Sequence, residues 1–202
     1  MIYPVYGYGH AVLKREAAEI DENFEGLDTL IANMFETMYA ANGVGLACPQ
    51  IGKGIRVFII DTTQLEDDEE ETADKIANNE VPFKNGVKKA FINPIMIEES
   101  GKAWNYEEGC LSIPDITADV SRKPNILIEY YDENFELHEV AYDGMNARVI
   151  QHEYDHLEGI LFTDHLRPLK RRLMSRKLEN IKKGKIDVDY VMKFSAAKKK
   201  RS

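Results

Sequence analysis

The chain has 202 residues, of which 44% are hydrophobic and 30% are charged, and its formal net charge is −9. These values are typical of a globular domain in water, and the absence of any run of roughly eighteen apolar residues argues against a membrane-spanning helix. The N-terminal residues 1–14 lack a basic segment followed by an apolar stretch, so we expect no secretion signal and a cytoplasmic location.

The hydrophobic pattern predicts both helices and strands. Apolar residues recur at helical spacing from Leu27 to Met38, so we expect an amphipathic helix at 26–41. A glycine-rich turn follows at 43–52. Runs rich in β-branched and aromatic residues then predict strands at 56–61, 89–98, 125–131 and 135–142.

Residues 62–86 interrupt this pattern. Seven of the nine residues from Glu66 to Asp74 are acidic, and the stretch has no apolar periodicity. We interpret 62–86 as an exposed acidic insertion loop.

Two further helices are expected near the C-terminus. The first covers 144–158, with Asp143 as its N-cap and Gly159 as its stop signal. The second, at 169–183, is basic and amphipathic. Because 167–202 holds fourteen Lys and Arg against three acidic residues, we divide the chain into a single domain at 1–166 and a basic C-terminal helix and tail at 167–202.

The most informative motif is HEYDH at 152–156, which matches the H-E-x-x-H pattern. On a helix, His152 and His156 project from one face and can bind one cation, while Glu153 can act on a water molecule there without being a ligand. Such a short match also arises by chance on charged helices. The apolar surroundings favour a metal site, since buried histidines and acids are costly unless paired or coordinated. Because the predicted strands precede and follow the 26–41 helix rather than alternating regularly with helices, we expect an α+β fold, with antiparallel β-sheets packed around a central metal-binding helix and a C-terminal helix.

A catalytic site needs a third protein ligand. The extended pattern H-E-x-x-H-x-x-G-x-x-H fails at its last position, which holds Phe162, and His165 lies three residues too late. Glu179 lies among lysines, a weak setting for a ligand. Cys110 is the stronger candidate, because 107–114 is expected to form a glycine-bearing bend that can approach the helix.

Three separated motifs now agree in order and approximate spacing. They are GVGLACPQ at 43–50, EGCLS at 108–112 and HEYDH at 152–156. With them the chain resembles the peptide deformylase family of bacterial type, from about residue 4 to residue 167.

The resemblance implies a hydrolase that removes the N-formyl group from the N-terminal methionine of newly synthesised proteins and releases formate. It assigns one divalent metal ion, expected to be Fe2+ with Zn2+, Ni2+ or Co2+ as alternatives, to Cys110, His152 and His156. Glu153 is then expected to transfer protons. The Gln50 side-chain amide and the Leu111 backbone N–H are expected to stabilise the oxyanion.

Substrate contacts are also expected. Val44, Met145 and Val149 are placed to line a methionine pocket, although Met145 and Val149 could equally be ordinary core residues. Gly45 and Gly109 would let an extended peptide backbone approach. By resemblance, Arg122 pairs with Asp155 and braces the helix; the alternative is that Asp155 is a surface acid.

The expected substrates are nascent formyl-Met polypeptides, and we expect a monomer with no membrane partner. The basic tail at 167–202 could dock on ribosomal RNA through phosphate attraction, or could simply cap the domain. A zinc endopeptidase of the H-E-x-x-H type is the alternative enzyme. A metal-stabilised RNA-binding module is the alternative without catalysis.

Overall fold

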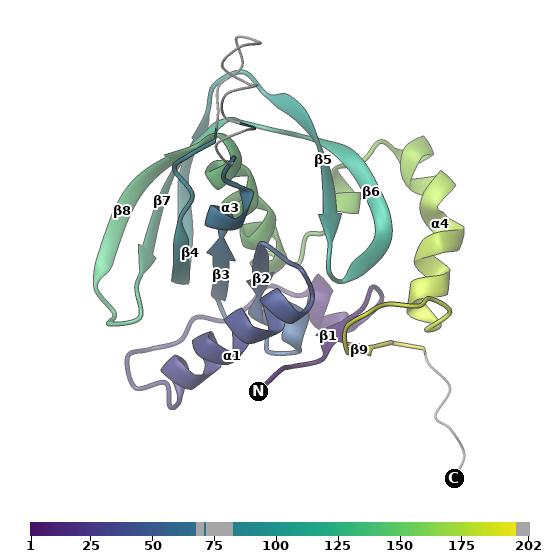
Figure 1. The fold of residues 1–202 in the computed structure, drawn as a ribbon, viewed down its shortest axis with the longest axis horizontal. Helices are drawn as coiled ribbons and strands as arrows, with labels where there is room; N and C mark the ends of the chain where they lie inside the picture. The colour runs from purple at the N-terminus through teal and green to yellow at the C-terminus, as the bar shows by residue number, and fades with distance from the viewer. Residues whose placement is uncertain (68–70, 72–82, 197–202) are drawn as a thin grey trace.

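The computed structural model describes residues 1–67, 71 and 83–196, and its described part arranges antiparallel sheets around one helix (Figure 1). The main sheet has five antiparallel strands in the order β2-β3-β4-β7-β8. These strands are β2 (Gly45–Ala47), β3 (Val57–Asp61), β4 (Lys88–Ser100), β7 (Asn125–Tyr131) and β8 (Leu137–Asp143). A separate antiparallel hairpin joins β5 (Trp104–Cys110) to β6 (Ile113–Arg122).

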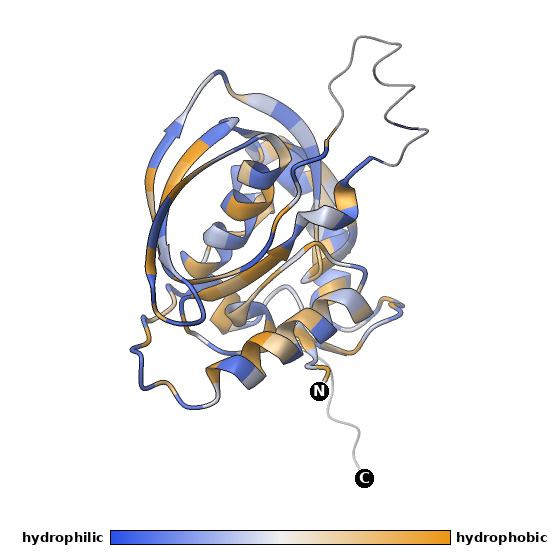
Figure 2. Ribbon diagram, turned by 60° about the vertical axis from the view of Figure 1, so that its left-hand side comes forward, coloured by the Kyte–Doolittle hydropathy of each residue, from blue (hydrophilic) through white to orange (hydrophobic). Residues whose placement is uncertain are grey.

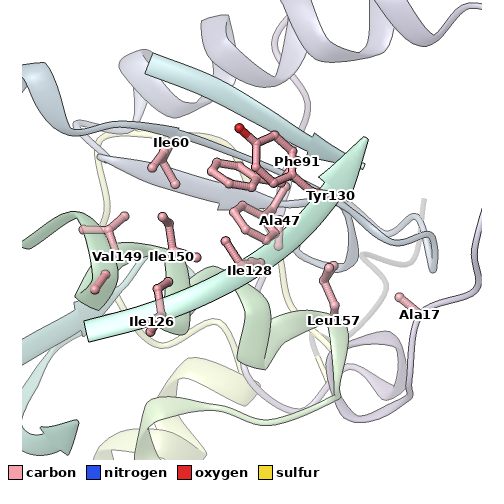
Figure 3. Close-up of a cluster of buried hydrophobic side chains, with 12 residues drawn as sticks. Ala17, Ala47, Ile60, Phe91, Ile126, Ile128, Tyr130, Val149, Ile150 and Leu157 are labelled. Atoms are coloured by element: carbon pink, nitrogen blue, oxygen red, sulfur yellow. The ribbon is translucent and has the colours of Figure 1, made fainter. Parts of the chain in front are cut away.

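Helix α3 (Gly144–Leu157) lies between the main sheet and the β5–β6 hairpin (Figure 1). Its apolar side chains Ile150 and Leu157 are buried against strands of the main sheet (Figure 3), and Ala147 belongs to the same buried cluster. The opposite side of α3 faces the hairpin and carries polar groups, including Arg148 and His152. One face of α3 therefore packs in the hydrophobic core, and the other face directs polar side chains toward the hairpin.

The remaining helices cover the outside of this arrangement. Helix α1 (Leu27–Ala40) buries Leu30, Met34 and Met38 against β2 and β3, and hydrophobic and hydrophilic residues alternate around it in Figure 2. Helix α4 (Pro168–Lys182) packs beside β6 through Leu178 and Ile181. Beyond α4 the chain turns back, and β9 (Met192–Lys193) pairs in parallel with β1 (Val5–Tyr6).

Most predicted elements are confirmed, with boundaries shifted by one or two residues, and the α+β class is correct. Gly159 follows the end of α3 with a positive φ of 70°, as a helix stop requires. Asp143 precedes α3, but its side chain makes no capping hydrogen bond; instead the Gly144 N–H donates to the Pro124 carbonyl. Among the described residues, no helix has both the length and the apolar character needed to cross a bilayer.

Three expectations need correction. The glycine-rich turn expected at 43–52 contains strand β2 and a 3-10 helix at Cys48–Ile51, because the main sheet pairs Gly45–Ala47 with β3. The irregular bend expected at 107–114 is wrong for most of its length, because β5 extends to Cys110 and β6 begins at Ile113. The polar residues of β5 do not show the apolar pattern of a strand, and backbone pairing with β6 stabilises it instead. The acidic insertion is not exposed at its start, where Thr62 is fully buried and donates to Asn146 Oδ1 at 2.5 Å. Residues 68–70 and 72–82 of that insertion lie outside the described part, and the division of the chain after residue 166 stays a prediction.

The core that holds α3 gives a stability prediction. Ile128 of β7 is fully buried, so Ile128→Ala should lower the free energy of unfolding by about 2–5 kcal/mol through lost packing and a residual cavity. Ile97 of β4 is 49% exposed, so Ile97→Ala should change it by less than about 0.5 kcal/mol. Urea unfolding of both variants measures this difference. Equal decreases in the free energy of unfolding would contradict the placement of Ile128 in the core.

Candidate active site

The three residues predicted as metal ligands meet at one point. His152 and His156 lie on one face of α3, and the end of β5 brings Cys110 to them. The Cys110 Sγ is 3.3 Å from His156 Nε2, and one ligand atom from each of the three residues lies within 4.8 Å of the others. Donors at about 2.0–2.3 Å from a tetrahedral ion are roughly 3.3–3.7 Å apart. The spacing therefore fits one metal ion after small adjustments.

The two imidazole rings are prepared for this arrangement. His152 Nδ1 lies 3.0 Å from Glu108 Oε2, which leaves its other nitrogen for a ligand. Burial lowers the pKa of His156 well below its ordinary value, so this ring is neutral and offers a lone pair. Against the effect of burial, hydrogen bonds to Cys110 and Glu108 raise the pKa of His152 well above its ordinary value, so metal binding at this ring releases a proton. A thiolate and two imidazoles suit a soft or intermediate divalent ion.

Glu108 connects both elements that carry ligands. Its carboxylate accepts hydrogen bonds from Arg122 Nε at 2.7 Å and from Arg148 Nη1 at 2.6 Å, in addition to the contact with His152. Burial alone would raise the pKa of Glu108, but the hydrogen bonds from His152 and Arg122 hold it well below its ordinary value. The carboxylate is therefore ionised, and it fixes β5, β6 and α3 relative to one another.

The predicted pair between Arg122 and Asp155 is present. Arg122 Nη1 donates to Asp155 Oδ2 at 2.8 Å, and His165 Nε2 lies 2.8 Å from the same oxygen. Asp155 is thus not an isolated surface acid. Arg122 joins it to Glu108, so these groups form one network beneath the ligands.

Glu153 lies beside the predicted metal ligands, and one of its carboxylate oxygens has no hydrogen-bond partner among the described residues. Its side chain is buried, and no described residue forms a hydrogen bond with Oε2. Burial raises the pKa of Glu153 to about 7. A Cβ atom at Gly45 would lie 2.5 Å from Glu153 Oε1, so the absence of a side chain at 45 makes the space that Glu153 occupies.

Gln50 and the turn after Cys110 also contribute to the site. The Ala47 N–H donates to Gln50 Oε1 at 2.8 Å, which directs Gln50 Nε2 toward Cys110 Sγ at 3.5 Å and Ser112 Oγ at 3.3 Å. Leu111 follows directly in the turn between β5 and β6. Gln50 and Leu111 line the same cavity.

These groups open into one cavity of about 390 Å³. The predicted site residues that line it are Val44, Gly45, Gln50, Gly109, Cys110, Leu111, Met145, Val149, His152 and Glu153. His156, Arg122 and Asp155 lie behind this wall. Val149 belongs both to the cavity and to the core cluster of α3, so its two interpretations are compatible.

Sequence reasoning assigned no role to Glu108, Arg148 or Tyr190. Glu108 stands inside the EGCLS motif, and Arg148 precedes His152 by four residues and shares its helix face, so both signals were present in the sequence. Arg148 also stacks over the Trp104 ring, 4.2 Å from its centroid. Nothing in the local sequence marks Tyr190, which lines the cavity from the segment after α4.

Comparisons with known proteins agree on one family. Residues 2–172 match the family model described as polypeptide deformylase. The chain is 53% identical to a peptide deformylase of Christiangramia forsetii and 51% identical to one of Flavobacterium johnsoniae, in both cases over 100% of each chain. It also resembles the crystal structure of a peptide deformylase from Legionella pneumophila, with 34% identity, a TM-score of 0.75, and coverage of 92% of this chain and 98% of that one.

The Glu108 network gives a second prediction. Glu108→Gln removes the buried negative charge that Arg122 and Arg148 share, so the free energy of unfolding should fall by about 3–5 kcal/mol. Affinity for Zn2+ should fall by about 10–100-fold, because His152 loses its partner. Urea unfolding and metal titration measure the two effects. The neighbouring Glu107 is exposed, so Glu107→Gln is the control, and matching behaviour of the two variants would contradict the role of Glu108.

Proposed function

The chain belongs to the polypeptide deformylase family, and from this premise we propose how its residues carry out the reaction. It is a metal-dependent hydrolase that removes the N-formyl group from the N-terminal methionine of newly synthesised proteins and releases formate. The family supports this interpretation and not the endopeptidase alternative. For the residue roles, the main support is the meeting of Cys110, His152 and His156 beside Glu153 in one cavity.

Cys110, His152 and His156 would hold one divalent ion. When bound, such an ion supplies Lewis acidity, which polarises a carbonyl and lowers the pKa of a coordinated water. We assign Fe2+ on the family resemblance, and the same ligands also suit Zn2+, Ni2+ and Co2+. The bond between His152 and Glu108 orients that ring toward the site.

Glu153 is the proposed proton carrier. Its Oε2 has no hydrogen-bond partner among the described residues, and the side chain lines the cavity next to the ligand His152. From this position it can accept a proton from the attacking water and deliver it to the nitrogen of the leaving amine. A single positioned group thus serves both proton transfers.

Gln50 and Leu111 are the proposed donors to the oxyanion that forms at the formyl oxygen. The Ala47 N–H holds Gln50 Oε1, so the amide nitrogen of Gln50 points toward the cavity before substrate arrives. The Leu111 backbone N–H approaches from the turn that follows Cys110. Donors fixed in advance contribute most where charge develops in the transition state.

The apolar part of the cavity is the proposed methionine pocket. Val44 borders it from the segment before β2, and Met145 and Val149 border it from the start of α3. Among the described residues, a Cβ atom at Gly109 would meet only Thr117 Cγ2, at 3.5 Å, so none of them requires glycine there. The space around Gly109 would let a substrate backbone approach β5 closely.

Three wider properties follow as proposals. Helix α4 exposes Leu169 and Leu173 among basic residues, which supports docking of 167–202 on the ribosome near emerging chains. Because its substrates are nascent chains, we place the protein in the bacterial cytoplasm. We propose that it acts as a monomer, since the ligands and the catalytic groups come from one chain.

Replacement of Glu153 tests the catalytic assignment. Glu153→Gln keeps the shape of the side chain but removes its ability to carry protons, so formate release from formyl-Met-Ala should fall by about 10²–10⁴-fold. Bound metal, measured by elemental analysis, should remain at one ion per chain. The exposed Glu139→Gln is the control. Activity near that of the control would refute the role of Glu153.

Gly45 offers a separate test of the same geometry. In Gly45→Ala the new methyl group overlaps the Glu153 carboxylate, so kcat should fall by about 10²-fold as that group is displaced. Gly54→Ala is a matched control, because a Cβ there meets no atom of the described residues within 4 Å. Steady-state assays measure kcat for both variants. A Gly45→Ala enzyme with unchanged kcat would show that Glu153 does not need the space left by the missing side chain at Gly45.

A further inference from the structure

Tyr8, near the start of the chain, and Tyr190, after α4, form hydrogen bonds with the turn that links β5 to β6. The Leu111 carbonyl accepts a hydrogen bond from the Tyr190 hydroxyl at 2.7 Å. The next carbonyl, that of Ser112, accepts one from the Tyr8 N–H at 2.8 Å. Both carbonyls of this turn are therefore fixed by segments distant from it in sequence.

These distant segments are themselves joined. Strand β9 pairs with β1, with Val5 opposite Met192 and Tyr6 opposite Lys193. The Val5 N–H donates to the Val191 carbonyl at 2.8 Å, directly after Tyr190. The position of the Tyr190 backbone is thus set by pairing with the N-terminal strand.

Tyr190 also reaches the catalytic cavity. Its side chain lines the same space as Gln50 and Glu153. Burial raises the pKa of Tyr190, so its hydroxyl stays protonated and acts as a donor at neutral pH. The Leu111 carbonyl that it binds is separated from the Leu111 N–H only by the φ and ψ angles of that residue.

We propose that Tyr190 is a positioning residue for the oxyanion donor of this enzyme. By holding the Leu111 carbonyl, its hydroxyl limits rotation at Leu111 and keeps the Leu111 N–H aimed at the reacting formyl oxygen. This inference rests on the proposed role of Leu111 in deformylation. It makes the segment after α4 part of the active site rather than only a basic extension.

Tyr190→Phe tests the inference, because it removes the hydroxyl and keeps the ring. The oxyanion exists only in the transition state and the intermediate, so kcat for formyl-Met-Ala should fall by about three- to tenfold while KM changes by less than about twofold. Amide hydrogen exchange of the peptide that contains Leu111 and Ser112 should become faster. Bound metal should be unchanged.

Tyr6→Phe is the matched control. It removes a hydroxyl from β1, the strand that pairs with β9 just after Tyr190, and this hydroxyl accepts from Lys193 Nζ at 3.1 Å. Among the described residues, it forms no hydrogen bond with the turn at 111–112. An unchanged kcat in Tyr190→Phe, or a raised KM at constant kcat, would overturn the positioning role and leave the proposed function intact. Absence of formate release by the unaltered protein would instead overturn the proposed function, and this inference with it.

Discussion

The buried carboxylate of Glu108 is the interaction on which the site depends. It lies two residues before Cys110 on β5 and contacts His152 on α3, so it sets the position of the thiolate relative to the imidazoles. Isolated charges are too costly to bury, and Glu108 is stable there because Arg122 and Arg148 both donate to it. A strand and a helix distant in sequence are thereby held at the separation that one metal ion requires.

The core supports this arrangement from the other side. Ile150 and Leu157 bury one face of α3 against the main sheet, so the helix cannot rotate its histidines away from β5. Gly45 on β2 then leaves the space in which Glu153 lies. The proposed catalytic groups are thus placed by packing on one face of the helix and by charge pairing on the other.

Local patterns in the sequence predicted much of this structure, and contacts between distant segments were harder to predict. The H-E-x-x-H spacing placed His152 and His156 correctly because both lie on a single helix. The hairpin of β5 and β6 escaped prediction, since β5 is polar and depends on its partner strand. Tyr190 could not be found from its neighbours, because its position results from the pairing of the two chain ends.

In our proposal, the Cys110 sulfur and two imidazole nitrogens bind one ion. X-ray absorption spectroscopy of the zinc-loaded protein measures this coordination directly. We expect one sulfur at about 2.3 Å and two imidazole nitrogens at about 2.0–2.1 Å, with the sulfur signal lost in Cys110→Ala. A zinc shell without sulfur, or one unchanged in Cys110→Ala, would contradict it.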